Sequence, residues 1–104
     1  QWQIAATVYV LQELRSKKKD IHALAAAHGA SRIRVFGSVA RGEETSKSDV
    51  DFLVDLPQGY DMFRQRVALT QKLSDFLQVG VDLVPEHELN KFIKQKVLEE
   101  AVDL

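Results

Sequence analysis

Two aspartates, Asp49 and Asp51, stand two residues apart at the start of an apolar run that continues to Leu56. Because side chains alternate across a strand, both carboxylates leave the same face, with their roots about 7 Å apart. Carboxylate oxygens are the ligands that Mg²⁺ and Mn²⁺ prefer. Two such ions can stabilise the attacking and leaving oxygens of a phosphoryl displacement. The pair therefore indicates metal-assisted chemistry on a phosphate.

A third carboxylate is expected beside this pair. Asp82 is the acidic residue inside the apolar run Val-Asp-Leu-Val at 81–84, which is typical of a strand. Neighbouring strands lie about 4.8 Å apart, so Asp82 is the candidate third metal ligand. Three clustered carboxylates repel one another, which should raise the pKa of at least one of them until a dication binds.

Gly37 and Ser38 form the other half of the predicted site. They follow a run typical of a strand and open a short turn or helix that continues to Gly42. Glycine allows a phosphate to approach the backbone closely, and the N–H groups at a helix start bind anions. The Ser38 hydroxyl and these N–H groups could hold a triphosphate, and Arg41 could add positive charge.

The elements that position these residues alternate between helix and strand. Helical spacing predicts helices over 4–14, 21–28, 61–78 and 89–97, with Asp20 as an N-cap and Gly29 as a left-handed C-terminal cap. Alternation and flanking breakers predict strands over 32–36, 50–56 and 79–84. The fold class is therefore α/β, a small mixed sheet packed with helices.

The first two strands should be antiparallel. Only ten residues, 39–48, separate Ser38 from Asp49, which is short for a parallel crossover with its own helix. In an antiparallel pair the end of the first strand lies beside the start of the second. This arrangement would place Gly37 and Ser38 next to Asp49 and Asp51.

Length and composition limit the classes of protein. A chain of 104 residues is expected to be a single domain over 1–104, and a formal charge of -1 gives no basis for whole-molecule attraction to nucleic acid or an anionic membrane. The absence of cysteine excludes disulfides, thiolate metal sites and a thiol nucleophile. With no apolar stretch near the 20 residues that span a bilayer, a cytoplasmic location is expected.

The run Gly-Ser-Val-Ala-Arg-Gly-Glu at 37–43, the ten-residue spacing and Asp-Val-Asp at 49–51 resemble the signature of the DNA polymerase β-like nucleotidyltransferase superfamily. The chain is most similar to its minimal nucleotidyltransferases over most of residues 10–104, and Val-Asp-Leu-Val-Pro at 81–85 resembles their third carboxylate segment. The resemblance implies the polymerase β-like palm fold. It also implies transfer of AMP from ATP to an acceptor hydroxyl.

In that resemblance Asp49 and Asp51 hold two Mg²⁺ ions, with Mn²⁺ as a possible substitute, and Asp82 holds the catalytic ion and helps to deprotonate the acceptor. Gly37 and Ser38 hold the nucleotide phosphates. The implied partner is a HEPN-type toxin, modified on a tyrosine, for which the protein is the antitoxin; no nucleic-acid or membrane partner is expected. Two alternatives stay open: neutralisation by binding alone, or transfer to small molecules or nucleic-acid ends.

Overall fold

A mixed four-stranded sheet forms the centre of the fold. The structure is a computed structural model and describes residues 9–45 and 47–104. The strands are β1 (Ile33–Phe36), β2 (Val50–Val54), β3 (Val81–Pro85) and β4 (Val102–Asp103), in the order β3-β2-β1-β4. β1 is antiparallel to β2 and to β4, whereas β3 is parallel to β2. The predicted α/β class and the antiparallel first pair are confirmed.

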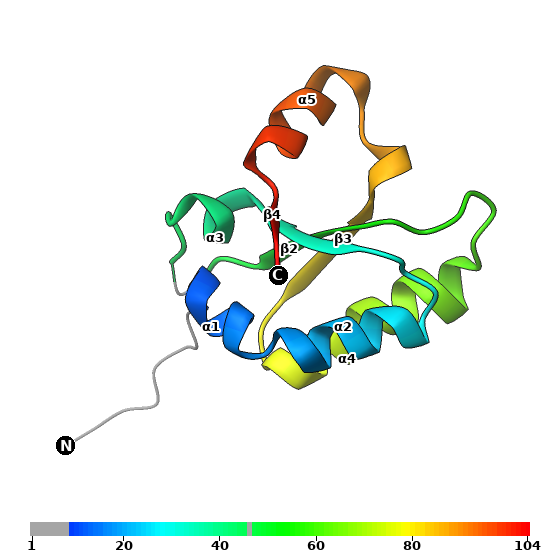
Figure 1. Ribbon diagram of the computed structural model, residues 1–104, viewed down its shortest axis with the longest axis horizontal. Coiled ribbons are helices and arrows are strands. Elements are labelled where there is room, and N and C mark those ends of the chain that lie inside the picture. The colour runs from blue at the N-terminus through cyan, green and yellow to red at the C-terminus, as the bar shows by residue number, and fades with distance from the viewer. Residues whose placement is uncertain (1–8, 46) are drawn as a thin grey trace.

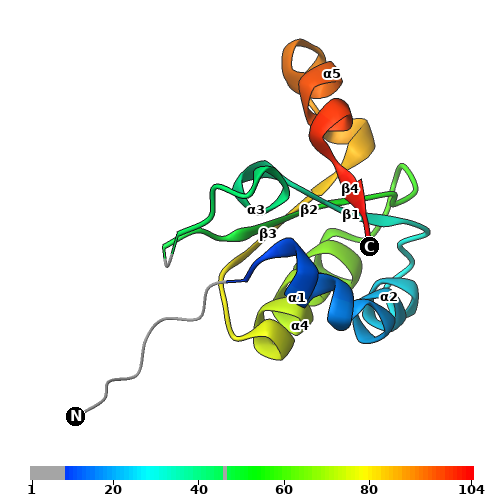
Figure 2. The ribbon, with the colours of Figure 1, turned by 60° about the vertical axis from the view of Figure 1, so that its left-hand side comes forward.

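The helices divide between the two faces of this sheet (Figures 1 and 2). They are α1 (Leu11–Ser16), α2 (Lys18–Ala27), α3 (Gly37–Arg41), the π-helical segment η1 (Met62–Val67), α4 (Ala68–Leu77), the 3₁₀ turn η2 (Glu86–Glu88) and α5 (Lys91–Glu100). α1, α2 and α4 cover one face, while α3 and α5 lie on the opposite side of the sheet. Successive side chains of a strand point to opposite faces of the sheet, so they pack against different helices.

The hydrophobic core lies between the sheet and the layer of α1, α2 and α4. Val50, Phe52 and Val54 of β2 point into this layer and are fully buried, as their alternation predicts. Leu73 and Leu77 of α4 pack against them from the helical side. Asp51 leaves β2 on the other face, so the core fixes the direction of its carboxylate.

The start of the second helix differs from the prediction. α2 begins at Lys18, so Asp20 lies inside its first turn and the prediction of Asp20 as an N-cap is wrong. An acidic side chain in the first turn still interacts favourably with the helix dipole. Gly29 follows the helix with φ +81, as predicted. The predicted helix over 4–14 falls partly on residues 1–8, outside the described residues, and α1 covers 11–16.

The helix predicted over 61–78 is continuous, but it changes from π-helical to α-helical geometry along its length. Asp61 begins it, and its side chain accepts the N–H groups of Phe63 and Arg64. η1 is π-helical, and its wider turn shifts the phase of the side chains relative to α4. Phe63 and Val67 are consequently exposed, although the α-helical spacing places them on the core stripe.

The last helix also departs from its expected role. α5 buries Val97, but Phe92 and Ile93 of its predicted apolar stripe are exposed. α5 stands away from the sheet in Figure 2, on the side of α3. The short strand β4 after it is absent from the prediction. In the part of the chain that the structure describes, no helix is long and apolar enough to cross a membrane.

Candidate active site

Asp51 and Asp82 face one another across the parallel pair of β2 and β3. Their Cα atoms are direct partners in the ladder, and neighbouring strands lie about 4.8 Å apart. Asp49 immediately precedes β2 and is exposed, as is Asp82, whereas Asp51 is half-buried. The structure therefore brings the three predicted carboxylates to one end of these two strands.

The ionisation of Asp51 reflects this crowding. Burial, and then the negative charges of Asp82 and Asp49, raise the pKa of Asp51 from 3.8 to about 6. The charge of Arg41 acts in the opposite direction and does not compensate. A surplus of negative charge at a half-buried carboxylate is the electrostatic environment that a bound dication relieves.

Two glycines leave room for the carboxylates. Gly37 is adjacent to the ladder pair of Phe36 and Asp51, and a methyl group added to it would collide with Oδ2 of Asp51. A methyl group on Gly80, just before β3, would collide with Oδ1 of Asp49. Gly37 also has φ +75, in the left-handed region that glycine adopts without strain. Both the backbone turn and the close contact with Asp51 explain glycine at position 37.

Ser38 follows as the second residue of α3 and is half-buried. The predicted proximity of Gly37 to Asp51 is present in the structure, and Ser38 is the next residue along the chain. Arg41 lies at the other end of α3, where its Nε donates to Glu43 at 2.7 Å and its Nη1 donates to Glu100 at 3.1 Å. Two carboxylates thus hold the guanidinium that the sequence offers as a candidate phosphate contact.

Glu100 is a site residue that the sequence does not reveal. It is the last residue of α5, and its Oε2 accepts the Gly37 N–H at 2.6 Å. Nothing in the residues around it marks a role, because its partners lie 59 and 63 positions earlier in the chain. Gly80 offered a weak signal, since a glycine inside a predicted strand, here 79–84, often marks a close approach.

The donor set fits a hard divalent cation in chemistry and charge, since Asp49, Asp51 and Asp82 supply oxygen ligands and the pKa of Asp51 is raised. The side chains are not assembled into a finished coordination shell: over residues 9–45 and 47–104, no three histidines, aspartates or glutamates are arranged to hold a metal ion. Asp49 instead rests against Gly80. Binding a metal would require these side chains to turn toward a common point.

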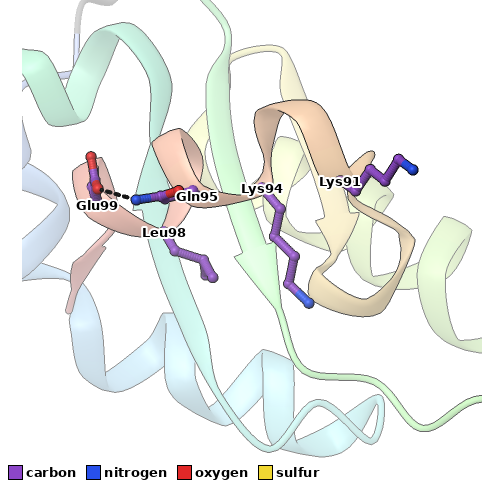
Figure 3. Close-up of a pocket in the computed structure, with 5 residues that line it drawn as sticks. All are labelled: Lys91, Lys94, Gln95, Leu98 and Glu99. Carbon is purple, nitrogen blue, oxygen red and sulfur yellow. Dashed lines mark hydrogen bonds between the residues drawn. The ribbon is translucent and has the colours of Figure 1, made fainter.

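The described part of the chain has two hollows of interest, one beside Asp82 and one on α5. One, of about 220 Å³, has Asp82 in its wall together with Met62, Val67 and Thr70. The other, of about 430 Å³, runs along α5 (Figure 3) and is lined by Lys91, Lys94, Gln95, Leu98 and Glu99. The α5 hollow contains no predicted site residue. The smaller hollow lies along the edge strand β3 and includes Asp82 in its wall.

Comparison with known proteins places this chain in a family. The nucleotidyltransferase domain family matches residues 10–104, which include all six predicted site residues. The chain belongs to this family. It is a minimal nucleotidyltransferase of the DNA polymerase β-like superfamily, and the fold class and enzyme class that the sequence predicts are confirmed.

Individual relatives agree. The protein adenylyltransferase MntA of Thermococcus cleftensis is 39% identical over 74 residues, covering 71% of this chain and 74% of that protein. A solved structure described as a minimal nucleotidyltransferase is 41% identical with a TM-score of 0.80, covering 92% of this nucleotidyltransferase and 97% of the other chain. A crystal structure of a toxin-antitoxin with AMP-PNP is 27% identical with a TM-score of 0.71, covering 83% and 70%.

Proposed function

We propose that this nucleotidyltransferase moves AMP from ATP to a hydroxyl group of a partner protein, and that the partner is a toxin that the modification inactivates. The observation that carries the proposal is the pairing of Asp51 with Asp82 beside the Gly37-Ser38 turn. The names of similar proteins support the rest, since one is a protein adenylyltransferase and another is a toxin-antitoxin crystallised with an ATP analogue. A HEPN-type toxin and a tyrosine acceptor are the specific forms that we propose.

In this proposal the start of α3 binds the nucleotide, and the three aspartates carry out the chemistry. Gly37 permits close approach of the triphosphate, and the Ser38 hydroxyl donates to a phosphate oxygen. Arg41 acts on the nucleotide through its charge, because its Nε and Nη1 already donate to Glu43 and Glu100. The start of α3 thus orients the α-phosphorus toward the carboxylates.

Asp49, Asp51 and Asp82 would hold Mg²⁺ or Mn²⁺, which when bound offsets the charge that develops on the phosphate oxygens. The acceptor oxygen forms a bond to the α-phosphorus as the bond to the leaving pyrophosphate breaks. The hydroxyl proton passes to the Asp82 carboxylate, which lies at the exposed edge of the sheet. The products are an AMP ester of the acceptor and pyrophosphate.

The acceptor reaches Asp82 from outside the chain. The hollow beside Asp82 combines the exposed apolar side chains of Met62 and Val67 with the polar residues Arg66, Thr70 and Gln71. A side chain such as tyrosine, with an apolar ring and a terminal hydroxyl, matches a lining that is partly apolar and partly polar. This hollow is therefore the entry that we assign to the acceptor.

Transfer of label tests the activity. The protein is incubated with Mg²⁺, ATP labelled at the α-phosphate and the product of the neighbouring gene, and the label on each protein is measured. We expect label on the partner, lost when Asp49→Ala and Asp51→Ala are combined. Undiminished transfer by the double variant would contradict the assignment of these carboxylates.

A second candidate is neutralisation by binding alone. It is favoured by the likeness to a solved structure of a toxin-antitoxin, since such proteins act on one another by contact. Mixing the Asp49→Ala and Asp51→Ala double variant with the toxin at equal concentration separates the two functions. Full neutralisation would favour binding, whereas a stable complex with an active toxin would favour catalysis.

A further inference from the structure

Glu100 connects two parts of the molecule that are far apart in the chain. It ends α5, and its carboxylate contacts both the first and the last residue of α3. Oε2 accepts the Gly37 N–H at 2.6 Å, and Nη1 of Arg41 donates to Oε1 at 3.2 Å and to Oε2 at 3.1 Å. The Glu100 side chain is only 16% exposed, and its contact with the Gly37 N–H is partly buried, whereas the Arg41 side chain is 43% exposed, so the ion pair is open to solvent on the arginine side.

The position of Glu100 is not explained by its own helix. A negative charge at the C-terminal end of a helix interacts unfavourably with the helix dipole, and the last turn of α5 contains no basic residue. The same charge is favourable at a helix start, where N–H groups lack partners within the helix. α3 has no side-chain cap of its own at Phe36, so Glu100 supplies from α5 the acceptor that α3 lacks.

We propose that Glu100 is a positioning residue for the nucleotide: by holding both ends of α3, it fixes Ser38 beside Asp51. The inference rests on the proposed function for the role of Ser38, while the contact itself does not. α3 is only five residues long, so its own hydrogen bonds fix its direction weakly. A charge-assisted bond at Gly37 and an ion pair at Arg41 restrain both the tilt of this helix and the turn that leads into it.

Two substitutions separate the contacts. Glu100→Gln keeps a carbonyl oxygen for the Gly37 N–H but loses the charge that faces Arg41, and Glu100→Ala loses both. Glu99→Ala is the matched control, because Glu99 is its neighbour and accepts instead from Gln95 within α5, at 3.1 Å (Figure 3). Both glutamates are on the last turn of the same helix, but only one reaches α3.

The first readout needs no nucleotide. Hydrogen exchange of the Gly37 amide, measured by NMR on the whole chain, should accelerate about tenfold or more in Glu100→Ala, the effect of losing one charge-assisted hydrogen bond. The exchange rate should be unchanged in Glu99→Ala. A Gly37 amide that exchanges equally in wild type and Glu100→Ala would overturn the inference.

The second readout is the affinity for Mg²⁺-ATP, measured by calorimetry. We expect Kd to rise about tenfold in Glu100→Ala and less in Glu100→Gln, with Glu99→Ala unchanged. If the role of Glu100 were only structural, Glu100→Ala would lower the unfolding midpoint and leave the Kd of the folded protein unaltered. That result, or tighter binding by Glu100→Ala, would refute a role of Glu100 in positioning the nucleotide. If wild type itself binds no ATP, the proposed function fails, and amide exchange still decides whether Glu100 holds α3.

Discussion

Neutralising Asp51 should stabilise the metal-free protein above pH 6. Burial and the neighbouring carboxylates raise the pKa of Asp51 from 3.8 to about 6, which corresponds to at most about 3 kcal/mol less favourable ionisation in the folded protein. Since the side chain is half-exposed, screening by solvent reduces this to about 1 to 1.5 kcal/mol. Asp51→Asn keeps the size of the side chain and removes the charge that is repelled.

The pH dependence has a definite sign. The folded pKa of Asp51 is above its unfolded value, so the folded state binds more protons between about pH 4 and pH 6. The free energy of unfolding therefore falls as pH rises through this window, and the loss is complete above it. Asp51→Asn should match wild type near pH 4 and exceed it by about 1 kcal/mol near pH 8, or roughly 4 to 8 °C in Tm.

Urea unfolding in the presence of EDTA measures this difference at the two pH values. Asp75→Asn is the control, because Asp75 is an exposed aspartate of α4 that already accepts a hydrogen bond from Gln71. We expect no change in its free energy of unfolding at either pH. The reasoning is refuted if Asp51→Asn is no more stable than wild type near pH 8, or if its gain is the same at both pH values.

Three further outcomes follow from the same structure. Mg²⁺ should raise the Tm of wild type more than that of Asp51→Asn, measured by calorimetry with and without the ion; an equal rise would place the metal elsewhere. Gly37→Ala should reduce ATP affinity, and it should lower stability more than Gly42→Ala does. Both glycines have positive φ, but of the two only Gly37 lies against a carboxylate. Equal losses of stability would contradict that contact. Arg34→Ala should lower the free energy of unfolding in urea by about 2 to 4 kcal/mol, since this buried guanidinium pairs with two partly exposed carboxylates. A loss below about 1 kcal/mol would show that those ion pairs contribute little.

The sequence predicts the parts of the fold that depend on local patterns. Alternation along β2 gives the correct faces for Phe52 and Asp51, and the ten-residue connection gives the correct antiparallel pair. The π-helical geometry of η1 has no counterpart in the α-helical spacing, so the exposure of Phe63 and Val67 is missed. β4 is missed because two residues are too few to show alternation, and its pairing with β1 depends on the fold.

The same division applies to the candidate site. Asp49, Asp51, Asp82, Gly37 and Ser38 are found from residue type and spacing, and the strand register brings them together. The Glu100 contacts depend on where α5 returns, which no local pattern encodes. The partners of Arg41 are hidden for the same reason, because an arginine near a glycine-rich turn is equally consistent with a phosphate contact and with an ion pair.

The intact mass of the partner tests the central claim most directly. The nucleotidyltransferase, Mg²⁺, ATP and the product of the neighbouring gene are incubated together, and both proteins are weighed by mass spectrometry. The account predicts that the partner gains the mass of one or more AMP units, and that the gain disappears when Asp49→Ala and Asp51→Ala are combined. A stable complex in which neither protein changes mass, with ATP and Mg²⁺ present, would contradict catalysis at these carboxylates.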